Sequence, residues 1–464
     1  MKYKDKKYEN LCIQQDEGEV TRVLNPSDIN VPQGYSIDVF AEGLDAPIEM
    51  LFINDSDILI ADAGSTSGNG KVMLLRDGNV SIIAEGFIPP LLGIAYREGN
   101  IYVSHKGYIT VIRSDGMREN IISGLPSYGD YSNTNIIFGP DNKLYFGMGS
   151  ATNSGVVGRD NTWIYNYPEF HDYPGDYIIL NGQNFESVNA FSLGDEQVLT
   201  GAFAPYGTQN LPFEKRKGVT KATGSILRSN TDGTGLELVA WGFRNPARIR
   251  FSNGNQLFAA NHGYDYRGSR PIANAVDELF AVQEGIWYGW PDFTNGELVN
   301  SSRFIIPGGP NPELLLNSYP NQPPRPYAIF PHYSTIMGFD FNISSEFGNI
   351  GDIYIAEFGR AGLPNQEDPY HYVGVGHRIS RIDVVTRGIT TFAINHSGFP
   401  SLISGEGGFG SPIDVKFGPD GAMYIVDMGI QLTSSSNLFR PNTGVIWRIR
   451  RSSVEEDGNN DNLI

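Results

Sequence analysis

The sequence has a single cysteine, Cys12, which excludes a disulfide within the chain and a metal cluster built from thiolates. It also lacks any run of 18 or more apolar residues, and its basic N-terminus, MKYKDKKYEN, is not followed by an apolar segment. We therefore expect no membrane span and no classical signal peptide. The cytoplasm is the default location, and an extracellular location stays open.

Basic residues are scarce relative to acidic ones. The chain has 34 lysines and arginines against 52 aspartates and glutamates, a formal net charge of -18. Such a surface repels a polyanion and offers no basic stripe to hold one. We therefore expect no nucleic-acid partner.

Turn-forming residues are plentiful instead, with 55 glycines and 28 prolines, and aromatic residues make up 12% of the chain. One hairpin pattern recurs: an apolar strand, a tight turn rich in Gly, Asp or Asn, and a second strand that ends in a small or polar residue. The six copies occupy residues 48–64, 92–107, 135–150, 247–263, 337–359 and 413–429. Most copies are followed by a second hairpin, and two hairpins make one four-stranded blade.

The two ends of this repeat complement each other. Residues 34–44, GYSIDVFAEGL, form a strand without a preceding partner, and residues 443–450, TGVIWRIR, form a third strand without a fourth. Their pairing would close the ring and protect both edges. The sequence thus predicts an all-β fold, a six-bladed β-propeller of four-stranded antiparallel blades over residues 34–451. Residues 1–33 are a polar leader that is either disordered or crosses the ring, and 452–464 are an acidic, disordered tail.

The long connections are predicted to leave one face of the ring. In an antiparallel blade, the turns between the first and second strands and between the third and fourth strands share one face, and all other loops share the opposite face. The long segments 150–223, 264–276, 293–336, 360–375 and 430–442 are assigned to the second class, as are all seven histidines: His105, His171, His262, His332, His371, His377 and His396. We expect this elaborated face to carry the function.

One segment carries a family resemblance. WGFRNPARIRFSNGNQLFAANHG, followed by VDELFAVQEGIWYGWPDF, resembles the core signature of the soluble quinoprotein glucose/sorbosone dehydrogenases: G-x-R-N-P, a strand pair, an acidic pair and Y-G-W-P. The resemblance extends from about residue 34 to 451 and leaves out the leader and the insertion at 150–223. It implies a propeller that binds pyrroloquinoline quinone (PQQ) over a calcium ion and oxidises a sugar or related alcohol.

The resemblance also implies a set of site residues. The cofactor contacts fall on Arg244 and Asn245, and His262 takes the place of a further polar contact. A guanidinium suits the oxygens of a quinone or a carboxylate. Calcium would be held by the backbone of Gly263 and Tyr264, with the acidic pair Asp277 and Glu278 downstream, because calcium accepts oxygen ligands in flexible loops.

The chain departs from the family pattern at two places. The family's basic histidine falls on Tyr131, and a tyrosine with an ordinary pKa near 10 would be protonated at neutral pH. His332 is the candidate that would replace it. Ser411 and Ile413 stand where sugar-oxidising members carry arginines beside the cofactor.

Two other functions stay open at this point. A propeller that has lost the catalytic base would use its aromatic insertions to hold a glycan or a protein. A calcium-dependent hydrolase such as a lactonase would need several oxygen ligands at the inner ends of the blades. The candidates for such ligands are Asp62, Asn135, Asn245, Asn261, Glu357 and Asp427.

Overall fold

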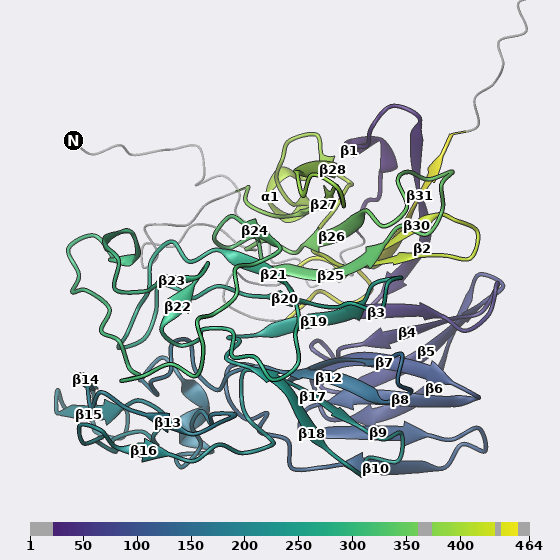
Figure 1. The fold of residues 1–464 in the computed structure, drawn as a ribbon. Coiled ribbons are helices and arrows are strands. Elements are labelled where there is room, and N and C mark those ends of the chain that lie inside the picture. The colour runs from purple at the N-terminus through teal and green to yellow at the C-terminus, as the bar shows by residue number, and fades with distance from the viewer. Residues whose placement is uncertain (1–21, 361–373, 432–437, 453–464) are drawn as a thin grey trace, which may run out of the picture.

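The computed structural model describes residues 22–360, 374–431 and 438–452. The first part of the leader (1–21) and the end of the tail (453–464) lie outside these ranges, so the expected disorder there is untested. Figure 1 shows strands arranged as successive blades around a ring, with short strands and long loops gathered on one side. Within the described residues, no helix is long and apolar enough to span a membrane.

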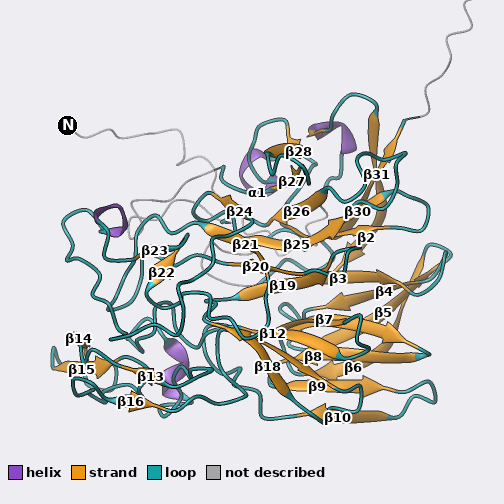
Figure 2. Cartoon of the chain, viewed as in Figure 1, coloured by secondary structure: helices purple, strands orange, loops and turns teal. Residues whose placement is uncertain are grey.

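Six antiparallel blades of four strands, one of them extended by a fifth strand, confirm the predicted propeller. Figure 2 shows these strands in orange. Blade 1 has β3 (Pro47–Phe52), β4 (Ile58–Asp62), β5 (Gly70–Arg76) and β6 (Asn79–Phe87). Blade 2 has β7 (Leu91–Arg97), β8 (Asn100–His105), β9 (Tyr108–Ile112) and β10 (Arg118–Ile122). Blade 3 has β11 (Asn133–Phe138), β12 (Leu144–Met148), β17 (Ser225–Ser229) and β18 (Glu237–Trp241).

The other half of the ring follows the same plan. Blade 4 has β19 (Pro246–Phe251), β20 (Leu257–Asn261), β21 (Asp277–Ala281) and β24 (Ala328–Phe330). Blade 5 has β25 (Ile336–Phe341), β26 (Ile353–Glu357), β27 (Arg378–Ile382) and β28 (Ile389–Asn395). Blade 6 has β29 (Pro412–Phe417), β30 (Met423–Asp427), β31 (Gly444–Arg451) and β2 (Tyr35–Leu44). The second strand of a blade is largely apolar because both of its faces pack against neighbouring blades, as in the fully buried β20.

Segments near both ends of the described chain hold the ring closed by pairing with the strands of blades 5 and 6. The strand β2 pairs antiparallel with β31, with Val39 opposite Trp447, which confirms the predicted closure of the sixth blade. Part of the leader is also attached: the short strand β1 (Ile29–Asn30) extends blade 5 by pairing with β28. Ahead of it, the Arg22 guanidinium donates to Asp427 over 2.7 Å in blade 6.

Each innermost strand contains a bulge at the same position. The register between the first and second strands of every blade shifts after the first residue of the inner strand, so the second residue is left out of the ladder. These six second residues are Ile48, Leu92, Thr134, Ala247, Met337 and Ile413. A bulge re-aims the residue that it leaves unpaired. All six line one central cavity and form its floor.

The third residues of the innermost strands follow these six along the central channel, and one of them, Arg248 of β19, also lines the cavity and is part of its floor. Packing there is tight: Gly338 of blade 5 has no side chain, and a Cβ atom at this position would overlap the side chain of Asp414 in blade 6. The floor and this second layer together close the channel beneath the cavity.

The long connections leave the ring mostly as predicted, with one correction. The insertion between β12 and β17 carries β13 (Ile178–Ile179), β14 (Asn184–Val188), β15 (Gln197–Gly201), β16 (Lys215–Arg216) and a short 3-10 helix. Residues 293–327, assigned to the elaborated face, instead belong to the connection between β21 and β24, the third and fourth strands of blade 4. This connection, with β22 (Phe293–Thr294) and β23 (Glu297–Leu298), packs against the insertion because Trp287, Trp290 and Phe304 share an apolar cluster with it.

Candidate functional site

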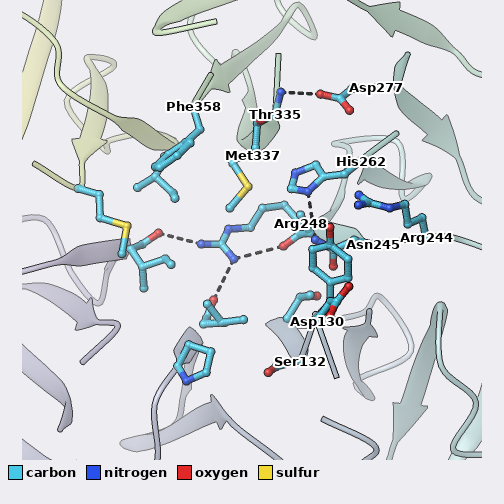
Figure 3. Close-up of a pocket in the computed structure, with 18 of the residues that line it drawn as sticks. Asp130, Ser132, Arg244, Asn245, Arg248, His262, Asp277, Thr335, Met337 and Phe358 are labelled. Atoms are coloured by element: carbon cyan, nitrogen blue, oxygen red, sulfur yellow. Dashed lines mark hydrogen bonds between the residues drawn. The ribbon is translucent and has the colours of Figure 1, made fainter. Parts of the chain in front are cut away.

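The central cavity opens on the elaborated face and encloses about 320 Å³. Its lining residues come from the ends of second strands, from loops between blades and from the six bulges. Of the nine site residues predicted from the sequence, eight line it: Tyr131, Arg244, Asn245, His262, Gly263, Tyr264, Asp277 and His332. Glu278 does not. Figure 3 shows Arg244, Asn245, His262 and Asp277 around the same space.

Arg244 is fixed on the cavity wall by contacts that leave part of its guanidinium unused. Its Nε donates to the carbonyl and the side-chain oxygen of Asn153, and Nη2 donates to Asp265 over 2.6 Å. The ring of Tyr131 lies 4.8 Å from the guanidinium carbon. Nη1 makes no hydrogen bond to the described residues. A cationic donor therefore remains for a ligand.

Asn245 is oriented by His262. The Nε2 atom of His262 lies 2.9 Å from the carbonyl oxygen of Ile336, an acceptor, so Nε2 carries the hydrogen. Its Nδ1 then accepts from the Asn245 amide nitrogen over 3.1 Å (Figure 3). Burial, together with the charge of Arg244, lowers the pKa of His262 to about 4, which keeps it neutral in this bridge. The second N–H of the Asn245 amide is left over as a donor.

The carboxylates of the cavity wall are occupied by donors. Asp130 accepts from Trp163 and Asn161 and pairs with Arg267 over 2.6 Å. Burial alone would raise the pKa of Asp265, but Arg244 and Arg267 outweigh it and hold this pKa well below its usual range. The charges of Asp130 and Asp265 are thus balanced by guanidinium groups, so these acids do not oppose an anionic ligand.

The acidic pair predicted to hold calcium has other partners. Asp277 accepts backbone N–H groups of Gly263, Thr335 and Ile336, and burial raises its pKa to about 7. Glu278 faces away from the cavity and accepts from Asn295 and Asn261. Such bonds cap loops. No three His, Cys, Asp or Glu side chains gather as a metal site in the part of the chain that the structure describes. The acidic pair does not fit calcium, and we assign no step to it.

The two candidates for the base behave differently. Burial raises the pKa of Tyr131 to about 12, so its phenol stays protonated and donates. His332 has Nδ1 2.6 Å from the carbonyl oxygen of Ala275, which places the hydrogen on Nδ1 and the basic lone pair on Nε2. Of the seven histidines, His262 and His332 line the cavity, and His371 lies outside the described residues.

The oxygen ligands predicted for a hydrolase are not brought together. Only Asn245 of that set lines the cavity. The others bond locally: Asp62 caps Gly64, Asp427 caps Ser411, and Asn261 caps Arg244 and Asn245. Asn135 bonds Ile249, and Glu357 bonds Ser380. The geometry that a metal-activated water needs is therefore missing among these residues.

The side of the cavity opposite the polar wall is apolar. It is lined by Met337 and Phe358 of blade 5, Ile413, Met428 and Phe439 of blade 6, and Ile48, Ala63, Pro90 and Leu92 of blades 1 and 2. Ile413 is the position where the resemblance implies an arginine, and the backbone N–H of the other such position, Ser411, is bound to Asp427. Sequence reasoning missed Arg248, which lies in the floor (Figure 3).

Comparison with solved structures places this arrangement among known propellers. The chain is similar to an aldose sugar dehydrogenase from Streptomyces coelicolor in its PQQ-bound form, with 15% identity, a TM-score of 0.52, and coverage of 91% of this chain and 99% of that one. It is also similar to the PQQ domain of a pyranose dehydrogenase from Coprinopsis cinerea in its holo form, with 12% identity, a TM-score of 0.55, and coverage of 91% and 97%. The chain has the fold of these soluble sugar dehydrogenases.

A third similar structure is a protein from Thermus thermophilus described as a putative oxidoreductase (glucose dehydrogenase), with 18% identity, a TM-score of 0.51, and coverage of 90% of this chain and all of that one. No protein-family model and no curated protein matches the chain.

The polar groups of the cavity fit a planar quinone that carries carboxylates. The unused groups include three donors: Nη1 of Arg244, the second amide N–H of Asn245 and the protonated phenol of Tyr131. Quinone and carboxylate oxygens are acceptors. The apolar side offers a surface for the flat face of such a ring, and the cavity has the size of a small-molecule site.

Proposed function

We propose that this chain is a sugar- or alcohol-oxidising propeller that holds PQQ in its central cavity. The observation that carries the proposal is the donor set of the polar wall: Arg244 and Asn245 are fixed by neighbours, yet each keeps an unused N–H group. The likeness of the fold to PQQ-bound dehydrogenases supports it.

In this proposal Arg244 and Asn245 orient the cofactor through its oxygens, and the apolar side excludes water from its ring. Bound PQQ would supply a two-electron acceptor for the hydride that leaves the alcohol carbon. His332 takes the hydroxyl proton at Nε2, because its Nδ1 hydrogen is held by Ala275. Tyr131 is a donor to substrate or cofactor oxygen and does not act as the base, since its pKa is too high.

The test separates binding from chemistry. Purified protein is titrated with PQQ, with and without calcium, while the absorbance of the cofactor and the melting temperature are followed; aldoses and polyols are then added. We expect PQQ binding at micromolar concentration and bleaching of the oxidised cofactor by a sugar. His332→Gln should bind PQQ normally and lose about 100-fold or more in turnover, whereas Tyr131→Phe should keep most of it.

Failure of PQQ to bind at micromolar concentration would sink the proposal. Sugar binding without PQQ binding would then point to the binding propeller. Equal turnover in His332→Gln and the wild type would reject His332 as the base.

A further inference from the structure

Arg248, the third residue of β19, crosses the axis of the propeller. Its side chain is buried, with 2% of the residue exposed. Nη2 donates to the carbonyl oxygen of Ile48 over 2.9 Å, and Nη1 to those of Leu92 over 3.0 Å and Ala247 over 3.2 Å. These three are second residues of innermost strands, so the guanidinium is held by carbonyls of the floor (Figure 3).

The charge of Arg248 lacks a directly paired counter-ion. Its two cationic neighbours in the channel are paired: Arg250 lies 3.1 Å from Asp340, and Lys416 lies 3.2 Å from both Glu49 and Asp414. The charge of Arg248 also acts on both of these carboxylates, and it is the largest of the charges that act on Glu49, although neither carboxylate forms an ion pair with it. Arg248 forms no ion pair with any carboxylate of residues 22–360, 374–431 or 438–452. Its Nε is buried and also has no hydrogen-bond partner there.

Such an arrangement is costly unless a ligand completes it. Carbonyl dipoles and the two nearby carboxylates hold the guanidinium in place, but its buried Nε–H has no hydrogen-bond partner among the described residues, which is unfavourable. Arg248 lines the cavity, so an anion at the floor would lie beside its guanidinium. The cation is already fixed in position, which reduces the ordering that binding requires.

The rest of the cavity shows where this anion would sit. Arg244 and Arg248 are the basic residues among those that line the described cavity. Arg244 lies on the polar wall and is paired with Asp265. On the apolar side, Ile413 and Met337 flank the floor without any charge. Arg248 is thus the cation available to a ligand that extends from the polar wall across the floor.

We propose that Arg248 is a carboxylate-binding residue in the floor of the cavity. The proposal rests on the proposed function, in which the cavity holds an oxidising cofactor and a sugar. The carboxylate belongs either to the cofactor, since PQQ carries three, or to an acidic sugar such as a uronate. A guanidinium binds a carboxylate through paired, charge-assisted hydrogen bonds.

The experiment compares ligands that differ in their carboxylates. PQQ binding is followed by absorbance, and binding of D-glucuronate and D-glucose by calorimetry and melting temperature, in the wild type, Arg248→Met and Arg248→Lys. Arg250→Gln is the matched control, because Arg250 lies two residues along the same strand and does not line the cavity.

We expect Arg248→Met to weaken binding of one or both carboxylated ligands by about 10- to 100-fold, the usual worth of a hydrogen bond to a charged group. Arg248→Lys should recover part of this loss, and glucose binding and the control should change by less than about threefold. A loss confined to PQQ assigns the site to the cofactor, and a loss confined to glucuronate assigns it to the substrate.

Unchanged binding of both carboxylated ligands in Arg248→Met would overturn the inference. If that variant does not fold, the wild type decides: a preference for glucuronate over glucose, or binding of PQQ that Arg248→Lys weakens, supports the inference, and their absence overturns it. A wild type that binds glucuronate through Arg248 but not PQQ would leave this site standing while the proposed function fails.

Discussion

The two sides of the cavity are built on opposite principles. On the wall formed by blades 3 and 4, the central polar side chains are tied to neighbours, as Arg244 is to Asp265 and Asn245 is to His262. On the side formed by blades 5, 6 and 1, side chains such as Met337, Ile413 and Met428 contribute shape alone. The wall therefore decides what binds and in which orientation, while the apolar side sets how much room there is.

The largest effect is expected on the wall. Arg244→Met removes three hydrogen bonds. It leaves Arg267 as the remaining ion-pair partner of the Asp265 carboxylate. We expect the free energy of unfolding in urea to fall by about 2–4 kcal/mol, since Arg244 is buried although Asp265 is partly exposed. PQQ binding should weaken at least about 10-fold. Arg113→Met is the control, because Arg113 and its partner Glu119 are exposed, at 39% and 55%, so the loss of this ion pair should leave the free energy of unfolding nearly unchanged. Equal losses in the two variants would contradict this.

A smaller effect comes from the bridge that orients the wall. The pKa of His262 is about 4 in the folded state and about 6.5 when unfolded, so the unfolded chain takes up a proton first as pH falls. Stability from this group is present above pH 6.5 and is lost toward pH 4. His262→Gln should shrink the difference in unfolding free energy between pH 7 and pH 5 by about 1–2 kcal/mol. The melting temperature at both pH values checks it, with His396→Gln as an exposed control. An unchanged pH dependence would show that His262 is protonated in the fold.

The smallest effect is expected on the apolar side. Met337→Leu and Ile413→Leu keep the volume and the apolar character of the surface, so each should cost less than about 1.5 kcal/mol and change PQQ or sugar affinity by less than about threefold. Calorimetry on both single variants and on the pair measures this. A tenfold loss would mean that this side recognises its ligand by precise contacts, which would remove the contrast between the two halves.

The fold was predictable because its signal is repeated. Six hairpins with the same turn chemistry, and strands 34–44 and 443–450 that lack partners, leave a closed ring as the simplest arrangement. The segment 293–336 was assigned to the wrong class of connection, because most of it joins β21 to β24, the third and fourth strands of blade 4. Nothing local reveals that Trp287 and Trp290 fold this connection back against the insertion on the elaborated face. Long-range packing decided that path.

The site was predictable where residues follow the ends of strands and less so elsewhere. Arg244, Asn245 and His262 meet because strand ends converge at the axis. Glu278 points away from the cavity because successive side chains of a strand alternate, and Asp277 takes the inward position. Arg248 was missed because its reach across the axis depends on the bulge at Ala247. A signal was present: alignment of the six inner strands puts Glu49, Gly93, Asn135, Arg248, Gly338 and Asp414 in one column, polar or glycine among apolar neighbours.

The closure of blade 6 also determines when the ring can close during synthesis of the chain. Asp38 and Arg448, which pair across β2 and β31, are 410 positions apart. At about 5–20 residues per second, the ribosome delivers the second strand about 20–80 s after the first. During that interval the backbone hydrogen-bonding groups of β2 are exposed because its partner strand has not been made. Blades 1 to 5 leave the ribosome in order during the same interval. The nascent chain must therefore keep one edge from pairing wrongly until β31 has been synthesised.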